Sequence, residues 1–448
     1  MSLARPPDII ATLAAPAPGR ARLGPVLAGH IVFTLLNSLL LANTGWLMPM
    51  LVRLKFGAGD PWVMDWQTTL VTAAVPTFMM LSVFWNELLR RVKLRTYLLL
   101  FWLVALCPFG CVGFVQSYWQ LAVCQIVANA GLAGGTPLTG KLLKHFYPDA
   151  VRGRVFALLS AVSLLSGIGG VSLLGTWLHA DPEAFRYYLP LAALLQVAAL
   201  AILWLLARRT GAPDEPLAAV TPSWAALLRP VLHMRRALRA DRTFLRYEGA
   251  FMTYGAAFML CEALLPVLAT DRLHLRYEQY ADATQVPFRL AMLLLTLPMG
   301  WLNDRAGPVR ICGLAFGTLA LYPLLLVATC WGGSSGASWG LTGLTIANVV
   351  FGLGLSGVQL GWTLGPVTLA GSPEKAPHYA AIHATLVGVR GVFFQGLGML
   401  LYKLTGRLEV PLLLAAGAFT WGAVQMWRLH VAMRWQGAAV CESSLRDG

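Results

Sequence analysis

The sequence predicts an all-α membrane protein in which twelve transmembrane helices form two pseudo-symmetric six-helix bundles. Three observations lead to this fold class: an apolar composition, a series of long apolar stretches, and a weak internal repeat. Of the 448 residues, 57% are hydrophobic and only 12% are charged, and the mean hydropathy is +0.64. A soluble domain carries about twice that share of charged residues. Most of the chain is therefore expected to lie in lipid.

Twelve stretches are long enough to cross a bilayer, which takes roughly 20 apolar residues per helix. They lie near residues 24–51, 66–86, 95–115, 118–140, 154–178, 187–207, 246–269, 278–302, 310–331, 340–371, 379–402 and 410–429. The fourth, eighth and tenth are rich in Gly, Pro or Thr. Spanning helices tolerate these residues because neighbouring helices satisfy the freed backbone groups and small residues allow close packing.

A two-fold repeat connects the first six stretches with the last six. Pro49-Met50-Leu51-Val52 closes the first stretch as Pro266-Val267-Leu268-Ala269 closes the seventh, and Val75-Pro76 in the second has a counterpart in Val286-Pro287 in the eighth. Such echoes indicate a duplicated unit. We divide the chain accordingly into a cytoplasmic N-tail at 1–23, an N-terminal bundle at 24–207, a cytoplasmic linker at 208–245, a C-terminal bundle at 246–430 and a cytoplasmic C-tail at 431–448.

The second part of the linker, from Ser223 onward, mixes Trp, Leu and Val with arginines. This mixture predicts an amphipathic helix on the inner membrane surface, with its arginines near anionic lipid headgroups. A regulatory or partner-binding helix is the alternative.

The positive charge is unevenly divided between the two sides of the predicted membrane. The net charge is +14, and 25 of the 34 Lys and Arg fall in segments placed inside when both termini are inside, against 7 in the outer loops. Such an excess sets the orientation of membrane proteins, so topology explains the charge and no nucleic-acid partner is expected. We predict a monomer in the cytoplasmic (inner) membrane of a bacterium, with both termini cytoplasmic.

The sequence gives no sign of enzyme chemistry. Its seven cysteines lie mostly in apolar stretches without Cys-x-x-Cys or Cys/His spacing, which predicts neither a disulfide framework nor a metal site. A P-loop, a Gly-x-Ser-x-Gly elbow and a His-Glu-x-x-His motif are all missing from the sequence. We therefore expect no enzyme activity, no cofactor and no metal.

The loop between the eighth and ninth stretches carries the most specific motif, Gly300-Trp301-Leu302-Asn303-Asp304-Arg305-Ala306-Gly307. This run resembles the cytoplasmic loop signature of the major facilitator superfamily, Gly-x-Leu-x-Asp-Arg-x-Gly. The resemblance extends over nearly the whole chain. It implies the fold of that superfamily and a transporter that works by alternating access, with the two halves rocking around a cavity near the midplane.

The same resemblance assigns gating roles at the cytoplasmic side. Asp304, Arg305 and Arg310 would lock the loop of the second half, and the run Arg152-Gly153-Arg154 resembles the basic stretch before the fifth span. The corresponding loop of the first half has no Asp-Arg-x-Gly, and Glu87 is the residue that would substitute for the missing aspartate. Topology alone is the alternative explanation for these basic residues.

Three charged residues lie deep within the apolar stretches, where each costs about 2.5–3.5 kcal/mol on insertion scales. At about 1.5 Å per residue, Arg390 lies near the midplane, Arg289 lies close to it, and Glu262 reaches the level of Arg289. In one hypothesis the two arginines bind an anion through their guanidinium forks while Glu262 couples a proton. In the alternative, Glu262 and Arg289 form a structural ion pair.

Several uncharged polar residues are further candidates for substrate contact: Asn37, Asn129, Gln285 and Gln359. Hydrogen bonding between helices is the default role of such residues. His383 lies seven residues before Arg390, on the same helix face. It is a candidate proton relay, with a packing role as the alternative.

These observations favour a secondary transporter of a small organic anion, coupled to protons or facilitative. Export of an amphiphilic or drug-like compound is the first alternative, and a transporter-like sensor or assembly protein that does not transport is the second.

Overall fold

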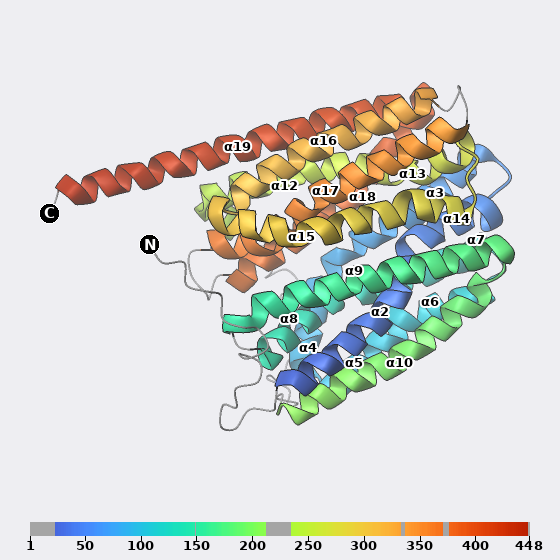
Figure 1. Cartoon of the computed structure of the whole chain (residues 1–448), viewed down its shortest axis with the longest axis horizontal. Coiled ribbons are helices and arrows are strands. Elements are labelled where there is room, and N and C mark those ends of the chain that lie inside the picture. Colours follow the sequence, from blue (N-terminus) through green and yellow to red (C-terminus); the bar gives the residue numbers. More distant parts are fainter. Residues whose placement is uncertain (1–22, 148, 212–233, 333–336, 371–375, 447–448) are drawn as a thin grey trace.

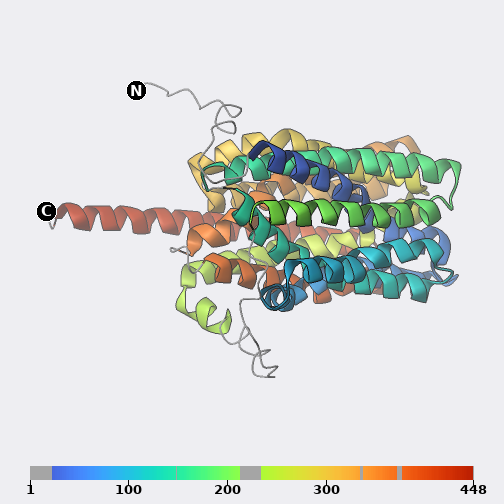
Figure 2. The same ribbon diagram turned by 90° about the horizontal axis from the view of Figure 1, so that it is seen from below.

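The computed structural model describes residues 23–147, 149–211, 234–332, 337–370 and 376–446, which are almost entirely helical and contain no strand. The helices run side by side in one bundle (Figures 1 and 2). Helix α2 (Leu23–Leu51) begins at the end of the bundle where α19 (Glu409–Arg446) projects beyond the other helices. We call this the terminus-bearing end, and the opposite one the distal end.

Each half of the chain supplies six spans, several of them built from consecutive helical pieces. The first half comprises α2, η1 (Val52–Phe56), α3 (Pro61–Thr77), η2 (Phe78–Leu81), α4 (Ser82–Arg91), α5 (Leu94–Phe101), η3 (Trp102–Leu106), α6 (Cys107–Cys111), η4 (Val112–Phe114), α7 (Tyr118–Leu132), α8 (Gly135–Phe146), α9 (Asp149–Ala180) and α10 (Phe185–Arg209). The second half comprises α12 (Arg242–Glu262), α13 (Leu264–Val267), η5 (Leu268–Arg272), α14 (Tyr277–Tyr280), η6 (Ala281–Gln285), α15 (Val286–Ala306), α16 (Pro308–Gly332), α17 (Ala337–Leu369), α18 (Ala376–Thr405) and α19.

The predicted fold class is confirmed. Eleven helices within the described residues are long and apolar enough to cross a membrane, and each coincides with one of the predicted stretches. The second predicted stretch, 66–86, is covered by α3, η2 and α4. Helix α3 buries several polar residues, and Thr68, Thr69 and Thr72 donate back to carbonyls one turn earlier.

The second span is also broken. Pro76 lies inside α3 and cannot donate a backbone hydrogen bond, and the chain then tightens into the 3₁₀ turn η2 before α4 begins. A short 3₁₀ stretch within a helix is a frequent site of bending. The first spans of the two halves share a different irregularity, because both end at the distal end in a π-helix, η1 and η5.

The two halves meet along two pairs of helices, which we call the seam. On one side α18 packs along α3, η2 and α4, and on the other side α15 and η6 pack along α9. Small residues bring the first pair together: a Cβ atom at Gly388 would lie 2.8 Å from the Met80 Cβ, and one at Gly391 would lie 2.8 Å from the Pro76 Cβ. The seam therefore places glycines of α18 against the broken part of the second span.

Two features of the terminus-bearing end follow from local chemistry. Gly307 ends α15 with φ of 77°, a left-handed conformation that favours glycine, and its N–H donates to the Asn303 carbonyl at 2.8 Å. Residues 212–233, which include the start of the predicted linker helix at Ser223, lie outside the described residues. Residues 234–240 are helical, with Met234, Ala237 and Leu238 packed on a cluster around Phe244 and the arginines exposed.

Candidate functional site

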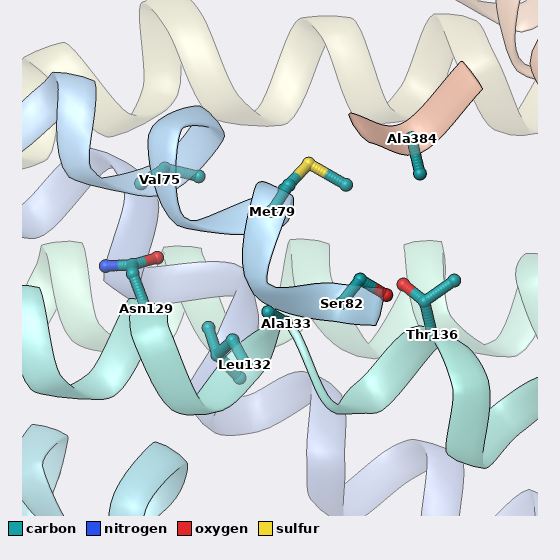
Figure 3. Close-up of a pocket in the computed structure, with 8 residues that line it drawn as sticks. All are labelled: Val75, Met79, Ser82, Asn129, Leu132, Ala133, Thr136 and Ala384. Atoms are coloured by element: carbon teal, nitrogen blue, oxygen red, sulfur yellow. The ribbon is translucent and has the colours of Figure 1, made fainter. Parts of the chain in front are cut away.

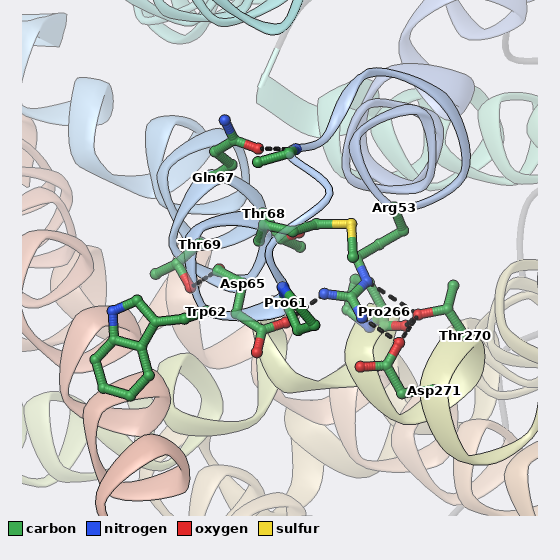
Figure 4. Close-up of polar contacts among 12 residues, drawn as sticks. Arg53, Pro61, Trp62, Asp65, Gln67, Thr68, Thr69, Pro266, Thr270 and Asp271 are labelled. Atoms are coloured by element: carbon green, nitrogen blue, oxygen red, sulfur yellow. Dashed lines mark hydrogen bonds and ion pairs between the residues drawn. The ribbon is translucent and has the colours of Figure 1, made fainter.

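Charged side chains close the distal end of the seam. Arg53 of η1 forms ion pairs with Asp65 of its own half and Asp271 of the other half, and its Nε donates to the Thr270 hydroxyl at 3.0 Å (Figure 4). Lys403 at the end of α18 forms an ion pair with Asp65. Both Arg53 and Asp65 are buried. Four charges from four spans thus connect the two halves twice, and we call them the distal lock.

A second connection crosses the seam at the same end. The His179 Nδ1 at the end of α9 lies 2.9 Å from the Glu278 carboxylate of α14. Both side chains are more exposed than the core of the distal lock. These ion pairs between the two halves close the distal end in this conformation.

A small cavity lies in the seam on the terminus-bearing side (Figure 3). Its volume is about 160 Å³, below the range typical of pockets for drug-sized ligands, roughly 300–1,000 Å³. The lining is mostly apolar, with three polar side chains, and comes from the second, fourth and eleventh spans: Val75, Met79, Ser82, Asn129, Leu132, Ala133, Thr136 and Ala384. Asn129 is the one predicted substrate contact that lines it.

Arg289 crosses the other side of the seam. It lies on α15, and its guanidinium donates to the Ala42 carbonyl of α2 at 3.0 Å. It also donates to the side chain of Gln285, another predicted contact, at 2.8 Å and to the carbonyl of that residue at 3.1 Å. Gly167 of α9 makes room, since a Cβ atom there would lie 3.3 Å from the Arg289 Nε. Arg289 is thus held by neutral oxygens of both halves.

Arg390 stays within the second half. It is only 3% exposed, and it donates to the Phe251 carbonyl at 2.7 Å. Its guanidinium carbon lies 5.6 Å from the Tyr254 ring centre and 5.9 Å from that of Trp362. A Cβ atom at Gly255 would lie 2.0 Å from that carbon, so glycine is required for the guanidinium to approach α12. In the described part of the chain, neither Arg390 nor Arg289 forms an ion pair.

The acids of the second half have other partners. The Glu262 carboxylate accepts from the Gln395 amide at 2.6 Å, so the expected alternative of a Glu262–Arg289 ion pair is not what the described residues form. The His383 Nδ1 lies 3.0 Å from both oxygens of Glu248. Sequence reasoning identified His383 but missed Glu248, which comes seven residues into α12 and looks like one more charge at a helix end.

The remaining predicted residues are scattered. Asn37 is half-buried on α2 and Gln359 is exposed on α17. Among the gating residues, Arg305 is exposed and lies 3.6 Å from the centre of the Trp301 ring, Arg310 is exposed, and Glu87 accepts from Arg91 at 2.8 Å within α4. The side chains of Asp304, Arg152 and Arg154 lie outside the described residues. No three His, Cys, Asp or Glu residues gather around a metal position in the described ranges.

Residues 31–402 match the sequence model of the Major Facilitator Superfamily. The chain therefore belongs to this superfamily and is a multi-pass membrane transporter, as the loop signature predicted. A comparison with proteins of curated function found no matching relative.

Solved structures of transporters share the fold. One is a POT family transporter in complex with 5-aminolevulinic acid, with a TM-score of 0.67 at 12% identity over 94% of this chain and 97% of that one. Another is a mutant of the nucleoside transporter NupG, with a TM-score of 0.64 at 13% identity over 90% and 99%. A third is a mutant of the peptide transporter POT in complex with alafosfalin. Its TM-score is 0.66 at 13% identity, over 94% of this chain and 98% of that one. At such identities the likeness concerns the fold alone.

Proposed function

We propose that this protein is a secondary transporter of a small organic anion, driven by a proton gradient or by the anion's own gradient. The terminus-bearing end faces the cytoplasm in this proposal, because most of the Lys and Arg residues lie on that side. Membership of the superfamily supports transport.

The anion proposal rests on the contacts of Arg289, which has only neutral partners among the described residues. A guanidinium within the bilayer is costly and faces a cavity or a partner as a rule. Here the partners are the Ala42 and Gln285 oxygens, all neutral, and they come from both halves. A carboxylate or phosphate binds two guanidinium donors in parallel, more strongly than a neutral carbonyl does. An anion that enters the seam would therefore replace Ala42 or Gln285 as the acceptor of Arg289 hydrogen bonds, and it would supply the negative charge that these neutral partners lack.

The distal lock supports alternating access. With Arg53, Asp65, Asp271 and Lys403 paired, an anion reaches the seam from the terminus-bearing end. Rocking separates Asp271 and Lys403 from the first half and opens the distal end. An anion that replaces the Ala42 contact of Arg289 changes the bond between α15 and α2, which links substrate binding to the movement of the halves.

A thermal-stability assay tests the anion proposal on purified protein. Small carboxylates, inorganic phosphate and lipophilic cations are added in turn to the wild type, Arg289→Gln, Arg289→Lys and the exposed-loop control Arg407→Gln. A ligand at about 100 times its dissociation constant adds roughly 2.7 kcal/mol. We expect an anion to stabilise the wild type and the Arg407→Gln control equally. It should stabilise Arg289→Lys less, and it should not stabilise Arg289→Gln. Equal stabilisation of all four variants by that anion would refute the assignment.

The cavity favours one alternative substrate class. Five of its eight lining residues, Val75, Met79, Leu132, Ala133 and Ala384, are apolar. An apolar lining suits an amphiphilic compound, and the second candidate function is export of such compounds. Stabilisation by lipophilic cations alone, unchanged in Arg289→Gln, would favour this alternative over anion transport.

A further inference from the structure

The Glu248–His383 pair is a buried charge cluster that the anion proposal does not use. Glu248 lies on α12 and His383 on α18, and each is 2% exposed. The imidazole Nδ1 lies 3.0 Å from both carboxylate oxygens, which places it symmetrically on the carboxylate. The pair is enclosed within the second half, so rocking of the halves leaves it intact.

The surroundings of the pair bring it close to one fixed charge. Phe251 packs its ring on the His383 ring at 4.7 Å, while its carbonyl accepts from Arg390. Trp362 of α17 likewise contacts both, with its ring centre 4.6 Å from that of His383 and 5.9 Å from the Arg390 guanidinium carbon. Two residues therefore bridge the imidazole and the guanidinium.

Few other titratable groups face the pair. Tyr247 of α12 donates to the Gly361 carbonyl of α17 and contacts the Cys312 thiol of α16 at 3.8 Å. Asp241 and Tyr379 bond each other nearer the terminus-bearing end at 3.0 Å. Across the seam, α4 carries the Glu87–Arg91 pair, and on α12 Glu262 is bonded to Gln395. Arg390 is thus the charged neighbour that shares contacts with His383.

The imidazole has an unused position. Its Nε2 is buried and has no hydrogen-bond partner among the described residues, and the same is true of the Arg390 Nε. A buried polar atom left unsatisfied costs about 1–3 kcal/mol. A packing histidine would be expected to satisfy both nitrogens. The unpartnered Nε2 is a position at which the imidazole can take up a proton.

We propose that the Glu248–His383 pair is the proton-binding site of this transporter, with Arg390 as its resident counter-charge. The neutral imidazole donates its Nδ1–H to the Glu248 carboxylate and takes up one proton at Nε2, and the resulting imidazolium keeps the Nδ1–H bond. Without the proton the charges of Glu248 and Arg390 sum to zero. With it the cluster carries one net positive charge in a low-dielectric interior, where an uncompensated charge is unfavourable.

This charge has a consequence for transport, which rests on the anion function proposed above. A protonated cluster makes the second half more attractive to an anion held at Arg289, and a bound anion in turn makes proton uptake more favourable. One proton and one monovalent anion would then move together without net charge. Glu262, the acid that sequence depth suggests for coupling, is assigned to interhelical bonding instead.

Histidine NMR on the whole protein tests the proton site without any substrate. The eight histidines are labelled with ¹⁵N in detergent, and His383→Gln identifies the resonance of His383. We expect that resonance to shift with pH as the imidazole takes up its proton. Glu248→Gln should weaken its proton binding at least about tenfold, since a carboxylate within hydrogen-bonding distance stabilises the imidazolium. The matched control Glu262→Gln should leave the titration unchanged.

Two results would overturn the proton site: a His383 resonance that does not titrate, or one that titrates alike in wild type and Glu248→Gln. Glu248→Asp, which keeps the carboxylate, should retain proton binding that Glu248→Gln loses.

A second measurement connects the site to transport. Proteoliposomes containing a pH-sensitive dye report proton entry driven by the carboxylate found in the stability assay. Glu248→Gln should keep anion exchange and lose anion-driven proton entry, and unchanged proton entry would contradict the assignment. A titrating His383 in a protein that no anion stabilises would leave the proton site standing and refute the anion function, so the two failures are distinguishable.

Discussion

The buried charges of this transporter fall into two groups that differ in what movement does to them. Arg289 and the distal lock lie on the seam and have partners in both halves. Glu248, His383 and Arg390 lie inside the second half and have partners only there. Rocking must break contacts of the first group and can preserve those of the second. We therefore expect seam changes to alter the conformational balance or substrate binding, and interior changes to alter proton dependence and stability.

The largest expected effect is on the seam. In Arg289→Gln the bound anion loses its charged partner, which costs about 2–5 kcal/mol, or roughly thirtyfold or more in affinity. Anion uptake into proteoliposomes at a fixed low concentration should fall accordingly. Arg390→Gln, the interior counterpart, should change the anion affinity much less and should mainly alter the pH dependence of uptake. If the two variants lost affinity equally, the division into two groups would be wrong.

The distal lock is expected to give the next largest effect. Asp65→Asn removes the partner of both Arg53 and Lys403, and breaking a buried ion pair costs about 3–5 kcal/mol when one charge remains. The Asp65–Lys403 pair crosses the seam, so the cost of losing it falls on the distally closed state. The population should shift toward distally open molecules, which spin-label distances between Gly59 and Gln279 would report in a cysteine-free background.

The control for the distal lock is Glu183→Gln, which breaks the Lys55 and Arg186 contacts at the same end but within the first half. The Gly59–Gln279 distance should not change in it. A shift as large as that of Asp65→Asn would show that charge at the distal end matters, rather than the connection across the seam.

The sequence predicted the fold well because spans and loop signature are local patterns. Eleven of the spans coincide with the described helices, and Arg289 and Arg390 could be identified by depth alone. The sequence did not reveal the distal lock, because Arg53 and Lys403 look like ordinary loop charges. Only in the folded chain do Asp65 and Asp271 lie next to them. Glu248 was missed for the same reason. The internal repeat offered one clue to the lock, because Arg53 and Asp271 lie at the ends of corresponding spans, the first span of each half.

A steric change inside the second half separates the position of Arg390 from its charge. In Gly255→Ala the new methyl group would overlap the guanidinium carbon at 2.0 Å, so Arg390 must leave the Phe251 carbonyl. Overpacking of this kind costs about 1–3 kcal/mol, which thermal unfolding would measure. We expect a lower melting temperature and an altered His383 titration, with anion affinity retained. The control Gly249→Ala, at an open position on the same helix, should be nearly neutral.

The smallest effect is expected for the exposed His179–Glu278 pair at the distal end of the seam. His179 and Glu278 are connected across the halves, but pairs of this exposure contribute only about 0.2–1 kcal/mol. His179→Gln should therefore move the Gly59–Gln279 distance distribution only slightly in the direction of Asp65→Asn. In the double variant the two shifts should add, because the residues share no partner. A His179→Gln shift equal to that of Asp65→Asn would mean that the surface pair holds the distal end closed, and that the buried charges of the lock serve stability within each half instead.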